Sequence, residues 1–107
     1  MTFEEHMEEG TLAIAVGNLE EAEKHFRKAT ELNPKYFEAW HSLGMAYMKL
    51  QKYPEAIEAG KKAVELNPND QFAHVSLSMY FQRNGQIAEA EAEATKAKII
   101  SWGGRLI

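Results

Sequence analysis

The chain has 107 residues, a formal net charge of −4 and 45% apolar residues, which is enough for one domain with a packed core. It has no cysteine, which excludes disulfides, thiolate catalysis and cysteine-based zinc sites. It also lacks the basic stripe that binding to nucleic acid or an anionic membrane requires. The acidic start MTFEEHMEEG is neither a secretory signal nor a transit peptide, and no apolar run reaches the ~20 residues that cross a bilayer. We therefore expect a soluble, cytoplasmic protein that neither binds nucleic acid nor inserts into a membrane.

The first two helices are separated by a glycine. Residues Thr2–Glu5 have the spacing of a capping box, in which the threonine hydroxyl and the glutamate each satisfy a free backbone amide. The helix that follows is expected to run to about Val16. Gly17 provides a left-handed residue that ends it, and Asn18 is expected to cap a second helix that reaches Leu32.

Four more helices follow, and turn residues mark their limits. Pro54 stands in the first turn of the fourth helix, where its missing amide costs nothing. Asp70 is a plausible cap for the fifth helix, and Asn84-Gly85 breaks the chain before the sixth. No segment alternates with period two, so no strand is expected. The expected bounds are about 37–50, 53 to the Leu66-Asn67-Pro68 break, 71–83 and 86–100.

A step of 34 residues relates these helices in pairs. The tripeptide Leu-Asn-Pro ends at Pro34 and again at Pro68. Alanines recur at the same step in two sets: Ala22, Ala56 and Ala90, and Ala29, Ala63 and Ala97. A fixed period of this size indicates a stack of helix–turn–helix units, none of which buries its apolar face alone.

The residues at these positions resemble the tetratricopeptide repeat. The family pattern of Trp, Leu, Gly, Tyr, Ala, Ala and Pro is matched by Trp40, Leu43, Gly44, Tyr47, Ala56, Ala63 and Pro68. The resemblance covers about three repeats and implies an all-α solenoid of three helix-turn-helix hairpins, with six antiparallel helices in a single domain, 1–107. The repeats fall at about 3–34, 37–68 and 71–102, and a short C-terminal tail, 103–107, follows them.

The first helix of each hairpin carries two apolar stripes on different sides. In the second hairpin, one stripe contains Trp40 and Leu43 and is expected to pack on the partner helix. The other stripe lies roughly 130° away around the helix. The family resemblance implies that this other side lines a concave groove for a peptide or a partner helix. Across the three repeats, the expected groove residues are Met7, Thr11, Ile14, His41, Met45, Met48, Phe72, Val75, Met79 and Gln82.

The expected groove is apolar and rich in methionine, whose flexible thioether suits apolar or helical ligands. The alternative is that these residues are ordinary core, or an interface with a second copy. Family members that grip acidic C-terminal peptides use Lys, Arg and Asn on this face, so a carboxylate clamp is not expected. Lys49 and Arg83 could still hold an acid at the groove rim, or simply form a solvated edge. The predicted function is a protein–protein interaction scaffold that binds a peptide or an amphipathic helix.

Some positions depart from the family pattern. His6 and His74 stand at the tryptophan position of their repeats. Gly60 falls inside a helix, where Phe26 stands one repeat earlier, at a propensity cost of about 1 kcal/mol relative to Ala. We expect Gly60 to make room for a large neighbour such as Tyr80.

Catalysis and metal binding have little support. Glu38 and His41 are three residues apart and could share a helix face, as metal ligands sometimes do. There is no second such pair, no His-Glu-x-x-His and no glycine-rich phosphate loop. No nucleophile–base–orienter set is visible. We therefore expect no enzymatic activity, no metal and no cofactor.

The segment after the sixth helix supports an alternative function. Gly103 and Gly104 are expected to end that helix, and the polar capping helix usual in the family does not follow. The tail could fold back, dock on another copy, or mark where a longer protein was cut. Docking would make the protein a self-assembly module, a homodimer or an open filament, held by the tail or the groove face. The residues left without an obvious cover are Ile99, Ile100, Trp102, Leu106 and Ile107.

Overall fold

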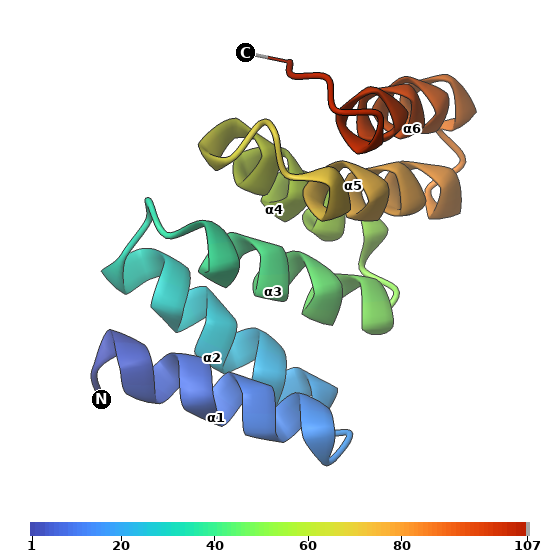
Figure 1. Cartoon of the computed structure of the whole chain (residues 1–107). Helices are drawn as coiled ribbons and strands as arrows, with labels where there is room; N and C mark the ends of the chain where they lie inside the picture. The colour runs from blue at the N-terminus through green and yellow to red at the C-terminus, as the bar shows by residue number, and fades with distance from the viewer. Residues whose placement is uncertain (107) are drawn as a thin grey trace.

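The computed structural model describes residues 1–106, which form six α-helices stacked in chain order and no strand (Figure 1). Each helix packs on the next one in the chain, so the molecule is a row of three hairpins with α1 and α6 at opposite ends. The expected all-α repeat fold is confirmed, and the expected helix ends are met within about one residue. The helices are α1 (Phe3–Ala15), α2 (Leu19–Leu32), α3 (Phe37–Lys49), α4 (Tyr53–Leu66), α5 (Gln71–Arg83) and α6 (Ile87–Ser101).

Two of the three expected helix caps form. The Thr2 hydroxyl accepts the Glu5 amide at 3.1 Å, and the Thr2 amide donates to Glu5 Oε1 at 2.8 Å. The Asp70 carboxylate accepts the Ala73 amide at 2.9 Å. The expected cap at Asn18 is wrong, because its side chain makes no such bond. Its ψ of 80° departs from the extended backbone of Thr2, ψ 168°, from which a capping side chain reaches the free amides.

The turn inside each hairpin uses one residue with positive φ. Gly17 (79°), Gln51 (63°) and Gly85 (81°) occupy this place at successive repeat steps. Glycine adopts this conformation freely, whereas an L side chain brings Cβ too close to the following carbonyl oxygen. The middle hairpin therefore turns on a strained residue.

Glycines in the helices make room for aromatic rings. A Cβ on Gly10 would lie 2.6 Å from the Phe26 ring. A Cβ on Gly44 or on Gly60 would lie 3.1 Å from Tyr80, whose side chain is 1% exposed. The expectation that Gly60 accommodates Tyr80 is confirmed.

The hydroxyl of Tyr80 is buried and has no hydrogen-bond partner among residues 1–106. The nearby Ser76 hydroxyl instead donates to Met45 Sδ at 3.9 Å, a contact that links α5 to α3. Burial raises the pKa of Tyr80, because it disfavours the phenolate. The nearby Ser76 hydroxyl lowers this pKa in part, but it makes no hydrogen bond of ordinary geometry to the phenol, so the buried hydroxyl is less well satisfied than it is in water.

Candidate functional site

A depression of about 250 Å³ lies between α1 and α3. It brings together five expected side chains: Thr11, Ile14, His41 and Met45 from the groove, and Lys49 from its rim. Two further lining residues, Phe26 and Ser42, were missed by the sequence analysis. The Phe26 ring packs against Gly10 of α1. The position of the ring therefore depends on how α1 and α2 pack together, which the sequence pattern does not show. The His41 ring stacks on Phe37, with 5.6 Å between the centroids.

The four groove methionines are half-buried. Met7 packs against the core cluster around Phe26, and it also lines an open hollow along α1 together with Thr11. Met45, Met48 and Met79 pack against the second core cluster, around Tyr80. Each methionine therefore contributes to the core and also reaches the surface. The packing contacts support the core alternative in part, and groove lining by these side chains stays a prediction.

Among the expected groove residues of α5, Met79 is half-buried and the others are exposed, and none of them lines this depression. Phe72 is 71% exposed and Val75 is 46% exposed, and Gln82 and Arg83 are also exposed. Val75 instead lines a separate hollow between α5 and α6. The structure therefore gathers Thr11, Ile14, His41 and Met45 in the depression. It brings neither Met7 and Met48 nor the expected residues of α5 into it.

The tail folds back on its own chain. The Gly103 amide donates to Ile100 O at 3.0 Å and the Gly104 amide to Ile99 O at 2.9 Å, as expected for glycines that end a helix. The Leu106 amide then donates to Asn69 Oδ1 at 2.9 Å, in the loop between α4 and α5. Among the expected self-association residues, Ile100 and Leu106 are half-buried, Ile99 and Trp102 are exposed, and Ile107 lies outside the described residues.

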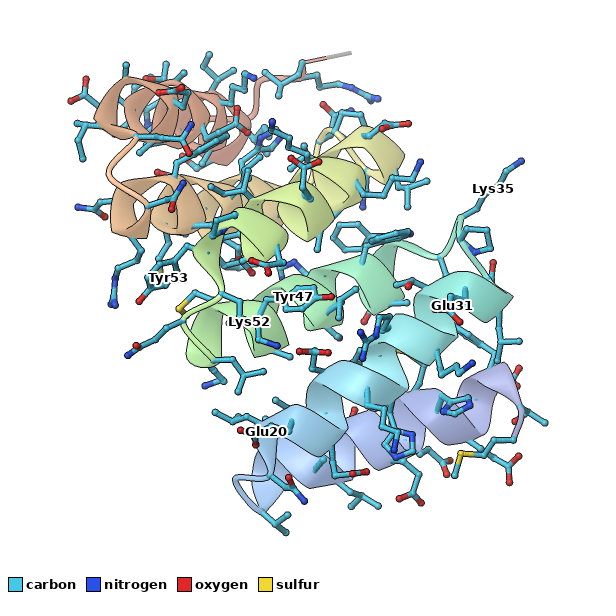
Figure 2. All side chains as sticks on the ribbon, turned by 180° about the vertical axis from the view of Figure 1, so that it is seen from behind. Glu20, Glu31, Lys35, Tyr47, Lys52 and Tyr53 are labelled. Carbon is cyan, nitrogen blue, oxygen red and sulfur yellow. The ribbon has the colours of Figure 1, made fainter. Side chains whose placement is uncertain are left out.

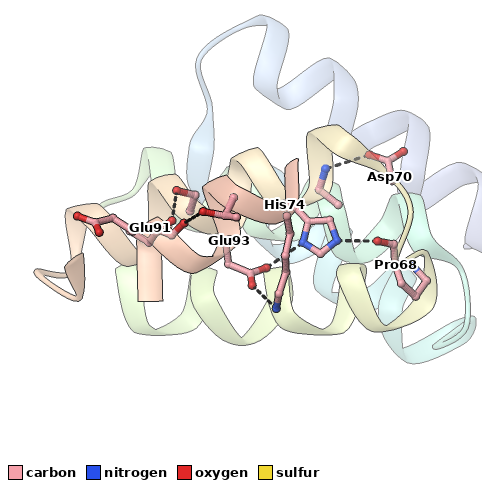
Figure 3. Close-up of polar contacts among 10 residues, drawn as sticks. Pro68, Asp70, His74, Glu91 and Glu93 are labelled. Carbon is pink, nitrogen blue, oxygen red and sulfur yellow. Dashed lines mark hydrogen bonds and ion pairs between the residues drawn. The ribbon is translucent and has the colours of Figure 1, made fainter. Parts of the chain in front are cut away.

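A buried polar cluster joins α5 to α6 (Figure 3). His74 Nε2 lies 2.6 Å from Pro68 O and Nδ1 lies 2.9 Å from Glu93 Oε1. Lys96 Nζ donates to the other oxygen of Glu93 at 2.7 Å. The carbonyl of Pro68 and the carboxylate of Glu93 both accept hydrogen bonds, so each ring nitrogen of His74 faces an acceptor. His74 thus replaces the family tryptophan, since Trp40 donates to Pro34 O in the same way at 2.7 Å.

A second buried carboxylate joins α2 to the turn before α4. Glu23 accepts from Lys52 at 2.7 Å and from Arg27 at 2.9 Å, and Lys52 extends over this junction beside Tyr47 (Figure 2). The hydrogen bond to Glu23 raises the pKa of Lys52. Burial, followed by the charge of Glu23, raises the pKa of Tyr47. These contacts fasten the first hairpin to the second.

A histidine pair joins α1 to α2. His6 Nδ1 and His25 Nδ1 are 3.0 Å apart, so one of them donates and the other accepts. Burial, and then the charge of His25, lower the pKa of His6. The described residues contain no group of three or more His, Cys, Asp or Glu side chains placed to hold a metal ion. None of the helices described here is long and apolar enough to cross a membrane.

Comparison with known proteins identifies the repeat. The tetratricopeptide repeat family profile matches residues 7–71, and no curated protein matches the chain. A crystal structure of MamA has a TM-score of 0.90 and 24% identity, over 95% of this chain and 60% of MamA. The TPR2B domain of yeast Sti1, in complex with pHsp70, has a TM-score of 0.89 and 23% identity, over 94% of this chain and 81% of that one. The first TPR of Spaghetti (RPAP3), bound to the HSP90 peptide SRMEEVD, has a TM-score of 0.89 and 18% identity, over 96% and 82%. At these identities the likeness establishes the fold alone, and the chain spans about 60% of MamA.

Proposed function

Because the chain belongs to the tetratricopeptide repeat family, we propose that it is a protein–protein interaction module whose groove binds an apolar or amphipathic helical segment. The depression between α1 and α3 carries the proposal, since seven residues from three helices line one surface there, five of them expected from the sequence. The Sti1 and RPAP3 domains of the same fold are described with a protein or peptide bound. Interaction is therefore the proposed role, and no catalytic step is assigned to the chain.

The lining favours an apolar ligand over an acidic one. Ile14, Met45 and the edge of Phe26 supply apolar area, and Lys49 is the one lysine or arginine of the depression. A carboxylate gains most from several cations that bind together, which a single exposed lysine does not provide. An amphipathic helix would instead place side chains at i, i+3, i+4 and i+7 against this surface.

Two labelled peptides test this choice by fluorescence polarisation. One is an amphipathic helix of about 18 residues with leucines at i, i+3, i+4 and i+7, long enough to become helical in water. The other is SRMEEVD, the peptide bound by RPAP3. We expect the amphipathic helix to bind and SRMEEVD to bind at least about tenfold more weakly. Tighter binding of SRMEEVD, lost on Lys49→Ala, would show a carboxylate clamp and contradict the proposal.

Variants locate the binding surface. Thr11→Glu places a charge in the depression at an exposed position and should weaken binding of the helix by about tenfold or more. Met45→Leu keeps the volume and apolar character, so it should bind almost as the parent does. Glu58→Gln changes an exposed side chain of α4 outside the depression and serves as the matched control. Equal binding by Thr11→Glu and Glu58→Gln would place the ligand elsewhere.

Self-association through the tail or the groove face remains the competing prediction. The Leu106 amide already has a partner within its own chain, which favours a tail held against this molecule over one docked on another. Cytoplasmic localisation likewise stays a prediction. Deletion of residues 102–107 separates the two functions, because it should abolish assembly through the tail under the competing prediction and leave peptide binding unchanged under the groove proposal.

A further inference from the structure

The two ends of the helix stack are both exposed and differ in shape. At one end, α1 exposes Leu12 (59%) and Val16 (79%). At the other end, a hollow of about 200 Å³ opens between α5 and α6, with Ser78, Ala94 and Lys98 among its lining residues. Figure 1 shows α1 and α6 as the outermost helices of the row. The apolar projection and the hollow therefore lie at opposite ends of the molecule.

Inside the stack, each junction between hairpins pairs a large residue with a small one. Where α3 packs on α2, Phe26 is the large residue and Ala46 the small one, and both lie in one core cluster. Where α5 packs on α4, Gly60 stands one repeat step after Phe26 and Tyr80 stands one step after Ala46. The Tyr80 ring lies 3.1 Å from the Cβ position of Gly60 and fills the space that a larger residue would take. At the first junction the large residue comes from the earlier helix, and at the second it comes from the later helix. The summed side-chain volume of each pair stays about the same.

The same register indicates what fits the exposed hollow. Ala94 stands one repeat step after Gly60 and is small, so the hollow requires a larger side chain from an adjoining helix. The place of Tyr80 corresponds to Leu12 in α1, two steps earlier. If α1 of a second copy stacks on α6 as α5 stacks on α4, its Leu12 arrives beside Ala94.

The charges at the two ends also match in this register. At the junction of α4 and α5, Val64 packs against the core cluster that contains Leu77. The repeat step places Lys98 where Val64 stands, and two steps place Glu9 where Leu77 stands. Lys98 borders the exposed hollow, and Glu9 lies beside Leu12 on α1. Two apolar residues that border the same hollow inside the molecule thus correspond to an ammonium and a carboxylate at its two ends. Such opposite charges would favour one register of stacking.

We propose that copies of this chain associate head to tail, with Leu12 of one copy entering the hollow between α5 and α6 of the next. This contact joins two different surfaces, so it does not close on itself and further copies can add. It is weaker than the inner junctions, because Glu91 stands where Ile57 is buried at the junction of α4 and α5. The depression between α1 and α3 shares no lining residue with this hollow, whereas Val75 of the expected groove lines the hollow and would be covered by the next copy.

Sedimentation velocity over a wide concentration range tests the contact, using two singly blocked variants. Leu12→Arg blocks the α1 end, and Ala94→Arg blocks the hollow. Each variant alone should stay monomeric where the parent chain associates, because the arginine has no partner in the contact. An equimolar mixture retains one intact pair of surfaces, so it should form a dimer and nothing larger.

A charge exchange gives a second readout at exposed positions that do not endanger folding. Glu9→Lys and Lys98→Glu should each lower the association constant by about tenfold, and the double variant should recover most of it. This pair keeps the test decisive if Ala94→Arg fails to fold. A parent chain that remains monomeric up to millimolar concentration, or a mixture of the blocked variants that forms no dimer, would overturn the proposal. So would association that survives Leu12→Arg but disappears when residues 103–107 are removed, since the tail would then be the contact.

Discussion

Replacing Gln51 by glycine should stabilise the protein. Gln51 has a φ of 63° at the turn where the other two hairpins use Gly17 and Gly85, with φ of 79° and 81°. Its side chain is exposed, so its removal takes little packing from the core. A side chain in the left-handed region costs roughly 1–2 kcal/mol. Glycine also gives the unfolded chain more conformational freedom, which offsets about 0.4–1 kcal/mol of the stability gained.

The expected net gain is therefore about 0.5–1 kcal/mol in the free energy of unfolding. For a domain of this size, that corresponds to a rise in Tm of roughly 2–6 °C. Urea and thermal unfolding of Gln51→Gly, followed by circular dichroism, measure both quantities. An unchanged slope with urea would show that the gain reflects stability and not a change in the unfolded ensemble.

The reverse substitution is the matched control. Gly85→Gln places the same side chain at the same turn one repeat later, where an added Cβ meets no atom within 4 Å. It should lower stability by a similar amount, because only the backbone conformation is penalised. If Gln51→Gly is neutral or destabilising while Gly85→Gln is tolerated, then positive φ is not the cost at this turn and the reasoning fails.

Three further predictions concern the packing and one histidine pair. Gly10→Ala should destabilise by about 1–2 kcal/mol in urea unfolding despite its better helix propensity, because the new Cβ would meet the Phe26 ring at 2.6 Å. Tyr80→Phe should raise stability by about 1 kcal/mol in the same assay, because it removes a buried hydroxyl without a partner among the described residues. The pKa of His6 is lowered in the folded state, so the unfolded chain binds the proton more readily. The stability that neutral His6 contributes is thus fully present above its ordinary pKa of ~6.5. It is lost as the pH falls through the lower pKa that His6 has in the folded state. His25→Gln should raise the pKa of His6 in an NMR titration, and an unchanged value would exclude the proposed influence of His25.

The helices and their limits follow from local signals in the chain. The capping box at Thr2, the proline at Pro54 and the glycines at Gly17 and Gly85 act within a few residues, so their effect does not depend on distant parts of the molecule. The middle turn is less obvious, because Gln51 gives no glycine signal and only the repeat step indicates its conformation. Asn18 shows the opposite failure, since a good capping residue is held by the turn at a ψ that prevents its side chain from capping.

The candidate site was partly predictable for the same reason. The repeat period assigned Thr11, His41 and Met45 to equivalent faces of successive helices, and the structure brings them into one depression. The period did not indicate that Val75 would lie towards α6, or that Phe26 would reach the depression from α2. Both depend on how neighbouring helices rotate and pack, which is set by side-chain volumes across the interface.

The sequence by itself determined the repeat, the number and limits of the helices, and the faces that their apolar residues share, because these depend on local backbone preference and on period. The tertiary structure alone decided that Phe26 packs against Gly10 and reaches the depression between α1 and α3, whereas the meeting of Gly60 and Tyr80 was predictable from the chain. It also decided that His74 and Glu93, 19 residues apart, form a buried pair, and that Leu106 returns to Asn69. These outcomes depend on contacts between helices, where volume, charge and hydrogen bonding must be satisfied together in three dimensions.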